Sequence, residues 1–538
     1  MKINYTVKLK TPALTASLGI IGKDVDVVVK VDSKGKPFFN GKHIKGILKE
    51  RVTQFKLGLG ESEDATKEFT DKYFGKEGNY IKDNNFDKIR FSNLVLVDEN
   101  NYNIDDRYGI KIDRKTRTTV HNSLFRYEHI TAGTEFKGDI EVPDKIDRED
   151  LKFILACLFH LDTIGGFKSR GIGKVDVFIK ERELKYKENE DIIDNIISEI
   201  LKSNKENSKA NLNGKLKKYS YTLSLKEPFI LTGREIGNYV EVRDSIQGST
   251  VRGAMIEYFA KSKDVSLEDL LCIEASDATS GDISLASKFI TKYAINGDKI
   301  ETDKIVDPRN EIEDKSKGKV VKLERKGTSM LKAKGNEISI AINSQTKSVE
   351  DGMLFNSEYL QCDEKLIGDI VLPEGLADEN KDYTIYLGKM KSKGFGEAVI
   401  KFGKYEKERA NLKARIEKLQ KQAKEKILTF DLQSDLILPF NTIYNVGEQF
   451  KSLVGISELK FEESKSYINT GKLGGYNIIN NIRKVDELVI TRGSVLTYEI
   501  DDFNSILPKL EEIEEKGLGL RKNEGFGRVK ISSERGEK

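Results

Sequence analysis

Two stretches of this chain repeat each other without a gap, and this repeat constrains the fold more than any other feature. Ile112–Pro143 aligns with Ile342–Pro373 at an offset of 230 residues, and nine of the 32 paired positions are identical. Such a level of identity is rare between unrelated segments. Because self-similarity at a fixed spacing indicates a duplicated structural unit, we expect at least two copies of one fold.

The flanks of these stretches repeat as well. A helix start made of glycine, three residues, a basic residue and glycine occurs in "GKHIKG" from Gly41 and in "GSTVRG" from Gly248. Each copy opens on an alternating strand and closes on a glycine-rich loop and a short strand. A third, shorter copy has its opening strand around Phe430, and "NVGEQFKSLVGI" is its nearest, weak match to the helix start.

The order in each copy is strand, helix, strands, helix, glycine loop, strand, which is the βαββαβ order of ferredoxin-like domains. The sequence therefore predicts an α+β protein with three tandem ferredoxin-like (RRM-like) domains joined by helical linkers. The expected domains are 1–185, 215–403 and 427–538, with linkers at 186–214 and 404–426. In the second linker Leu412, Ile416, Leu419 and Ala423 form a helical apolar stripe.

Three loops interleave glycine with basic residues: "GGFKSRGIGKV" from Gly165, "GKMKSKGFGEA" from Gly388 and "GLGLRKNEGFGRV" from Gly517. Backbone N–H groups of such a turn can converge into an anion-binding nest, so each loop can hold one sugar–phosphate step without reading the base. A tight turn with incidental lysines is the alternative. The residues predicted to contact RNA are Gly166, Lys168, Arg170, Gly171, Gly173, Lys391, Lys393, Gly394, Gly396, Arg521, Lys522, Gly525 and Gly527.

Further basic residues lie outside these loops. Lys45 and Arg252 stand at the repeated helix starts, where a helix N-terminus favours phosphate. Arg114, Lys115 and Arg117 form a cluster inside the repeat. Residues 315–334 hold eight basic residues and one acid, which predicts an exposed hairpin or loop, with an ordinary solvated face as the alternative.

Overall composition leaves the partner open. The 91 basic and 88 acidic residues give a net charge of +3, so only local clustering can indicate a polyanionic partner. Cys157, Cys272 and Cys362 form no CxxC pair, so we expect neither zinc nor a disulfide framework. The N-terminus alternates like a strand rather than a signal peptide, and no apolar run approaches the roughly 18 residues of a membrane span. We therefore expect a cytoplasmic protein with no membrane partner.

The glycine loops, the repeated helix starts and "IDRKT", together with "LFRYEHITAGTEFKGDI", resemble the RAMP superfamily, the RNA-binding subunits of type III CRISPR effector complexes. Residues 1 to about 185 resemble a backbone-type subunit that lines the guide RNA. Residues 215–538 resemble a type III-D RAMP subunit, whereas the linkers and residues 254–335 match poorly. The resemblance implies guide RNA, target RNA and other type III effector subunits as partners.

The resemblance also implies a β-hairpin "thumb" that disrupts guide–target pairing, and "RYGIKIDRKTRTTVHNSLF" from Arg107 matches it. In the second copy Asn343 and Ser344 replace the Asp-Arg pair, so its thumb is expected to be altered.

Backbone-type subunits of the family cleave target RNA with one aspartate in the loop after the first strand. Asp26 is the favoured candidate and Asp24 the second, with Mg²⁺ or another divalent metal assisting attack of a ribose 2′-OH on its own phosphate. The metal ligands are unknown. The second copy has no aspartate at the matching place and is expected not to cleave.

Three other interpretations are open. If both aspartates are plain loop residues, the chain is an architectural guide-binding subunit without catalysis. A repeat-processing endoribonuclease of the same superfamily could use His43 or His121 as acid or base. An RNA-binding protein outside CRISPR is the third, although the aromatic pattern of ordinary RRM domains is absent.

Overall fold

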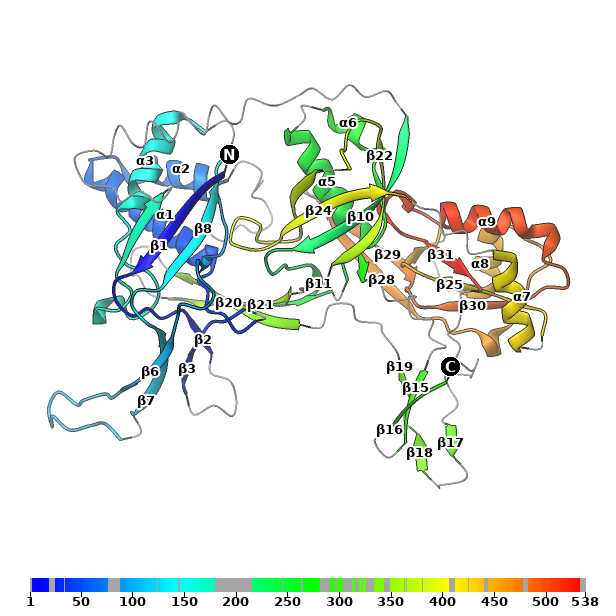
Figure 1. Cartoon of the computed structure of the whole chain (residues 1–538), viewed down its shortest axis with the longest axis horizontal. Helices are drawn as coiled ribbons and strands as arrows, with labels where there is room; N and C mark the ends of the chain where they lie inside the picture. The colour runs from blue at the N-terminus through cyan, green and yellow to red at the C-terminus, as the bar shows by residue number, and fades with distance from the viewer. Residues whose placement is uncertain are drawn as a thin grey trace.

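The computed structural model consists of three sheet-centred units placed side by side (Figure 1). It describes residues 2–18, 25–32, 34–75, 88–121, 123–143, 146–179, 215–243, 245–262, 265–280, 291–295, 298–302, 312–314, 319–321, 323–325, 333–342, 349–361, 363, 365–379, 381–405, 412–423, 425–439, 444–477 and 482–532. We refer to residues 2–179 as the first unit, 215–405 as the second unit and 425–532 as the third unit.

The three main sheets share one strand order. Numbered along the chain within each unit, the four strands stand in the order 2-3-1-4, and every described pairing among them is antiparallel. In the first unit the sheet consists of β4 (Arg90–Phe91), β8 (Glu135–Glu141), β1 (Lys2–Leu9) and β9 (Val175–Ile179). In the second unit it consists of β13 (Glu274–Ala275), β22 (Leu366–Pro373), β10 (Leu216–Leu225) and β24 (Glu397–Lys404). In the third unit it consists of β27 (Lys460–Phe461), β30 (Val495–Glu499), β25 (Ile427–Leu432) and β31 (Val529–Ile531). This arrangement is a mixed α+β fold of antiparallel sheets with few helices, as the sequence predicts.

Helices cover the sheets, with one difference from the expected order. The first unit has α1 (Gly41–Gly58), α2 (Glu63–Phe74) and α3 (Arg148–Phe159), the second has α5 (Gly248–Ser262) and the short α6 (Leu267–Leu270), and the third has α8 (Val446–Val454) and α9 (Leu507–Lys516). The second helix predicted for the second unit is wrong, because β23 (Asp382–Tyr386) pairs with β24 there. Tyr383 and Ile385 alternate with exposed neighbours and are buried, which is the period of a strand.

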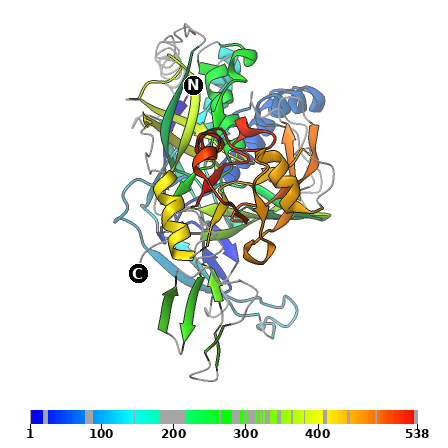
Figure 2. The same cartoon turned by 90° about the vertical axis from the view of Figure 1, so that its right-hand side faces the viewer.

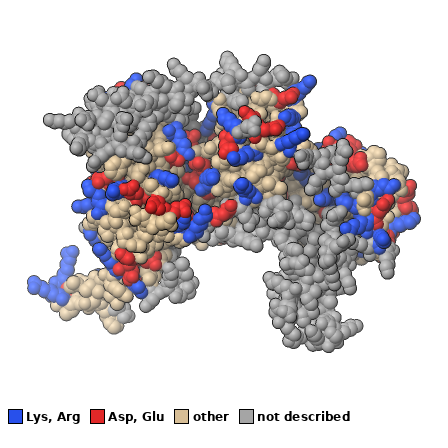
Figure 3. All heavy atoms as spheres, in the orientation of Figure 1, with Lys and Arg blue, Asp and Glu red and all other residues tan. Residues whose placement is uncertain are grey.

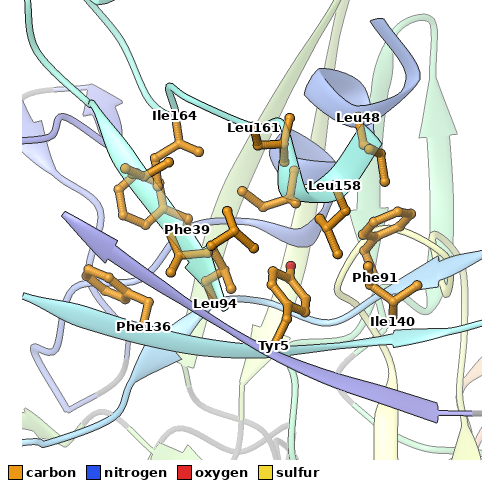
Figure 4. Close-up of a cluster of buried hydrophobic side chains, with 14 of the residues drawn as sticks. Tyr5, Phe39, Leu48, Phe91, Leu94, Phe136, Ile140, Leu158, Leu161 and Ile164 are labelled. Carbon is orange, nitrogen blue, oxygen red and sulfur yellow. The ribbon is translucent and has the colours of Figure 1, made fainter. Parts of the chain in front are cut away.

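The core of the first unit lies between its sheet and its helices. Tyr5, Phe91 and Ile140 from the sheet meet Leu48 of α1 and Leu158 of α3 (Figure 4). The segment between α1 and β8 also contributes β5 (Val95–Leu96) to the edge of this sheet.

One identity of the sequence repeat, the pair Gly138 and Gly368, has a clear packing reason. Gly138 stands opposite Tyr5, and Gly368 stands opposite Tyr221 in the second unit. A Cβ at Gly368 would lie 2.5 Å from the Tyr221 ring, so only glycine leaves room for the buried tyrosine.

Each unit carries a second, smaller sheet built from its connections. In the first unit this sheet consists of β2 (Ala16–Leu18), β3 (Val27–Val29), β7 (Phe125–Ile130) and β6 (Ile104–Gly109). In the second unit it consists of β11 (Thr232–Ile236), β12 (Tyr239–Val242), β21 (Val349–Gln361) and β20 (Ala333–Ile342). In the third unit it consists of β26 (Leu436–Ile437), β29 (Ile482–Ile490) and β28 (Thr470–Asn477). Another identical pair of the repeat stabilises these sheets in the first and second units: Glu128 accepts the N–H of Val29 at 2.9 Å, and Glu358 accepts that of Val242 at 3.1 Å.

Two hairpins project from the same side of the molecule (Figures 1 and 2). The first arm, residues 104–130, is formed by β6 and β7. The second arm comes from the insertion between β14 (Thr279–Ser280) and β20 and contains β15 (Thr291–Ile295), β16 (Asp298–Thr302), β17 (Ile312–Asp314), β18 (Lys319–Val321) and β19 (Leu323–Arg325). Part of the basic segment 315–334 therefore belongs to the second arm.

The second linker contains the predicted helix, α7 (Leu412–Ala423), and the first linker lies outside the described residues. Leu412, Ile416 and Leu419 are buried, and Leu412 and Ile416 belong to the core of the third unit. Among the described helices, none is both long and apolar enough for a membrane span.

Candidate nucleic-acid interface

The three glycine loops have one backbone conformation. In each, positive φ angles occur at the first, third, seventh and ninth positions of a nine-residue frame, and the third position is not glycine. The residues are Gly165, Phe167, Gly171 and Gly173 (φ 83, 55, 77 and 84°); Gly388, Met390, Gly394 and Gly396 (75, 58, 82 and 89°); Gly519, Arg521, Gly525 and Gly527 (77, 54, 90 and 72°). The glycine spacing of the sequence is therefore a requirement of this turn.

Each loop is fastened to the start of its own unit by the same pair of backbone hydrogen bonds. In the first loop Gly166 donates to the carbonyl of Leu14 (2.8 Å) and Gly173 to that of Pro12 (2.7 Å). In the second loop Lys389 donates to the carbonyl of Ile230 and Gly396 to that of Pro228. In the third loop Leu520 donates to the carbonyl of Ile437 and Gly527 to that of Asp435. These N–H groups point into the chain and are not available to an anion.

The second loop docks on the helix start of the first unit. The carbonyl of Lys393 accepts the N–H of Lys42 (3.0 Å), while Asn93 accepts the N–H of Gly41 (2.8 Å) and donates to the carbonyl of Gly394 (2.9 Å). The first N–H groups of a helix lack partners within the helix. Asn93 and the second loop supply those partners for α1.

The third loop docks on the second unit in the same way. Asp277 accepts the N–H of Gly248, the first residue of α5, at 2.7 Å. A Cβ at Gly525 would lie 2.7 Å from the carbonyl oxygen of Ala275 and 3.2 Å from the Asp277 carboxylate. Asp277 thus occupies the place of Asn93, and each of these two loops seals the helix start of the preceding unit.

Most basic residues predicted at these contacts have partners within the chain. Lys45 is only 7% exposed and donates to Ser392 at 2.9 Å. Arg252 donates to the carbonyls of Leu271 and Ile273, both at 2.6 Å. A contact between these residues and RNA stays a prediction.

Ion pairs involve the basic residues of the docked loops. Lys391 lies 2.8 Å from Glu257, and although burial alone would raise the pKa of Glu257, Lys391 and Lys261 hold it at about 2. Arg521 pairs with Glu524 at 2.6 Å and also with Glu487. Lys522 is exposed.

The first loop exposes its basic side chains. Lys168 and Arg170 are exposed, and the guanidinium of Arg170 lies 4.6 Å from the centre of the Phe167 ring. At the start of the loop His43 accepts the N–H of Gly165 through Nε2 (2.7 Å). Burial, with Lys168 nearby, lowers the pKa of His43 to about 4, so the imidazole is neutral and acts as an acceptor.

Burial of the neutral His43 makes the stability of the first unit depend on pH. The folded state holds His43 neutral, so its contribution is complete above the usual histidine pKa of about 6.5 and is lost as the pH falls through about 4. We expect the first unit to lose about 1–3 kcal/mol of unfolding free energy over that range. Urea unfolding at pH 7 and pH 4.5 measures the loss, and His43→Gln, which keeps an acceptor without titrating, should reduce it; an equal loss in the variant would contradict the assignment.

The tip of the first arm carries the predicted basic cluster. Arg114, Lys115 and Arg117 are exposed there, and Figure 3 shows basic side chains at the end of this projection. Asp113 organises the tip by accepting the N–H groups of Lys115 (2.7 Å) and Thr116 (2.9 Å). The equivalent tip of the second copy, with Asn343 and Ser344, lies outside the described residues.

Asp26 lies at the base of the first arm, immediately before β3, and Asp24 lies outside the described residues. The carboxylate of Asp26 is exposed and accepts the N–H of Arg126 at 2.7 Å, while its own N–H donates to the carbonyl of Arg126 at 2.9 Å. Tyr239 stands at the matching place in the second unit, three residues before Val242, and its hydroxyl donates to Glu358 at 2.6 Å.

The described residues do not form a metal site by themselves. No group of three or more carboxylate, histidine or cysteine side chains converges within the parts of the chain given above. The structure therefore supplies no step through a metal, and the divalent ion stays a prediction. The two histidines considered as acid or base have different environments. His43 accepts a hydrogen bond from the first loop, and His121 is exposed on the first arm.

Sequence reasoning missed Asn93 and Asp277, the side chains that complete the docking contacts. Each follows a serine and stands two residues after the edge strand of its sheet, in "FSN" and "ASD". It also missed Glu337 of β20, a buried carboxylate that contacts Lys30 at 2.5 Å and Asn40 at 3.1 Å across the first and second units. Short dipeptides of this kind are too common to stand out without the structure.

Comparison with solved structures gives distant similarities. A chain described as "Type III-B Cmr-beta bound to cognate target RNA" is 14% identical, with 55% of this chain and 89% of that chain covered and a TM-score of 0.32. A chain of the "Apo state" of Type III-B Cmr-beta is 10% identical, with 34% of this chain and 99% of that chain covered and a TM-score of 0.28. A chain of a "Type IV-B CRISPR Complex" is 12% identical, with 34% of this chain and 92% of that chain covered and a TM-score of 0.25. No curated protein matches the chain.

The family comparison is specific to the first unit. The matched region contains the second half of β1, α1, the first arm and the first glycine loop. It ends at the beginning of β9, the strand that this loop precedes. Residues 6–176 of this chain match the model of the RAMP superfamily.

Proposed function

We propose that this chain is an RNA-binding subunit of an RNA-guided CRISPR effector complex of type III, built from three tandem RAMP domains, and that its first arm contacts the RNA. The observation that carries the proposal is the exposed basic tip of an arm inside the segment that matches the RAMP superfamily. Exposed basic groups on a projecting hairpin suit the phosphate backbone, which dominates nucleic-acid affinity.

The finer family assignment belongs to this proposal. A backbone-type first domain fused to a type III-D subunit agrees with the repeated strand order and with the position of the arm. Guide RNA, target RNA and other effector subunits are the proposed partners, and the cytoplasm is the proposed location.

Loss of charge at the arm tip tests RNA binding. We expect Arg114→Ala with Lys115→Ala to weaken binding of the guide RNA about tenfold and to lower the slope of log affinity against log salt by up to about 2. Fluorescence anisotropy across a salt series measures both quantities. The control is Lys413→Ala with Lys421→Ala, which removes the same charge from exposed positions on α7; equal weakening in both variants would contradict a role for the arm.

Cleavage of target RNA by the first unit is the second part of the proposal. An exposed aspartate fixed to the base of the arm can take the proton of a ribose 2′-OH while that oxygen attacks the adjacent phosphorus. The reaction forms a 2′,3′-cyclic phosphate and releases a 5′-hydroxyl. Asp26→Asn keeps an acceptor for the N–H of Arg126 but loses the basic carboxylate.

We expect Asp26→Asn to reduce cleavage of guide-complementary RNA at least 100-fold while RNA binding is retained. Gel analysis of the cleavage products with Mg²⁺ measures the rate, and Asp105→Asn, on the exposed face of β6, is the matched control. Unchanged cleavage by Asp26→Asn would leave the architectural alternative.

A further inference from the structure

The first glycine loop has the conformation of the two docked loops, yet its docking position is open. Gly171 corresponds to Gly394 and Gly525. A Cβ at Gly394 would lie 2.1 Å from the Asn93 oxygen, and one at Gly525 would lie 2.7 Å from the Ala275 carbonyl. At Gly171 no described atom lies within 4 Å of that position.

We propose that the first glycine loop, residues 165–173, docks a separate protein subunit through a glycine-initiated helix start. In the second loop, two carbonyl groups receive the N–H of the second helical residue and the side-chain amide of Asn93. The carbonyls of Arg170 and Gly171 occupy the same frame positions. The partner therefore offers a helix that begins on glycine and an Asn, or a protonated Asp, beside it.

A second copy of this chain offers no free helix start of this kind within its described residues. The start of α1 is sealed by its own second loop, and the start of α5 by its own third loop. In the third unit the corresponding helix, α8, begins on Val446 and not on glycine. Its Gly447 packs against Phe461, and a Cβ there would lie 2.3 Å from the ring. The partner is thus a different protein with an unsealed helix start.

The hydrogen bonding of the first loop favours a protein donor over a phosphate. An anion nest requires free N–H groups. Those of Gly165, Gly166, Arg170, Gly171 and Gly173 already donate to acceptors of this chain. The open position is bordered by carbonyl oxygens, which attract N–H groups and repel phosphate oxygens.

Photo-cross-linking in the intact complex tests the proposal. The full chain, with benzoylphenylalanine in place of Arg170, is isolated with its companions and irradiated. We expect a cross-link to another protein, in a peptide that begins a helix on glycine or carries the adjacent Asn or Asp. Lys393, at the same frame position of the second loop, is the matched control and should link within the chain to the segments around Gly41 or Asn93.

A second variant separates docking from RNA binding. Gly171→Asn fills the open position with a residue that tolerates positive φ. We expect the cross-linked subunit to be lost at least tenfold from the isolated complex. A cross-link from position 170 to RNA, to a second copy of this chain or to nothing would overturn the proposal, as would loss of RNA with the subunit retained; absence of RNA from every preparation would instead contradict the proposed function.

Discussion

We expect Asp277→Asn to raise the unfolding free energy of the second and third units at pH 7.5 by about 1–3 kcal/mol. Desolvation raises the pKa of Asp277 to about 6, and Asp435 adds to this, while the N–H of Gly248, Arg492 and Arg528 oppose it. The carboxylate is therefore held in a place that prefers a neutral group. Asn93 already supplies such a group at the equivalent contact.

The pH dependence follows from the direction of this shift. The folded state binds the Asp277 proton more tightly than the unfolded state, so the stabilising contribution is complete below about pH 4 and is lost as the pH rises through about 6. Urea unfolding between pH 4 and pH 8 measures it, and Asp277→Asn should flatten this component. The reciprocal variant, Asn93→Asp, should introduce the same component at the contact between the first and second units; if neither variant changes the profile, the side chains do not decide the stability of the docking contacts.

Gly396→Ala should destabilise the second unit by about 3–5 kcal/mol, because it combines backbone strain with steric overlap. Gly396 has a φ of 89°, and a Cβ there would lie 2.1 Å from the carbonyl oxygen of Leu387. Its own carbonyl accepts the N–H of Leu387 at 2.8 Å, so the backbone cannot rotate without losing that hydrogen bond.

Hydrogen exchange of the amides in β23 and β24 measures this local loss of stability. Gly253→Ala is the control within the same unit, since Gly253 lies in α5 with no atom near the added Cβ. Alanine there should stabilise the helix by about 0.5–1 kcal/mol. Similar protection in the two variants would show that the turn tolerates side chains, and the glycine spacing would then need another cause.

The sequence predicted the repeated elements better than their contacts. The ungapped match of the two copies located β7, β8, β21 and β22, because the packing of Gly138 and Gly368 and the hydrogen bonds of Glu128 and Glu358 are local consequences of one fold. The alternation in Asp382–Tyr386 is typical of a strand, whereas the βαββαβ order assigned a helix to this part of the second copy.

The partners of the glycine loops could not be read from the sequence. The bond between Asn93 and Gly394 joins residues 301 apart, and that between Lys45 and Ser392 joins residues 347 apart. Local spacing shows that a turn needs glycine, but the same carbonyl-rich turn can face water, RNA or a helix start. Only the three-dimensional arrangement distinguishes these environments.

Covalent linkage gives the two sealed helix starts a property that separate subunits would lack. Because the second and third loops belong to the same polypeptide as the helices they cover, their association is intramolecular, with an effective concentration on the order of millimolar for a flexible tether. Dilution cannot separate these units, and they cannot exchange with other copies. The order and the ratio of the three units are therefore fixed at synthesis, whereas any partner at the first loop joins by mass action and can leave.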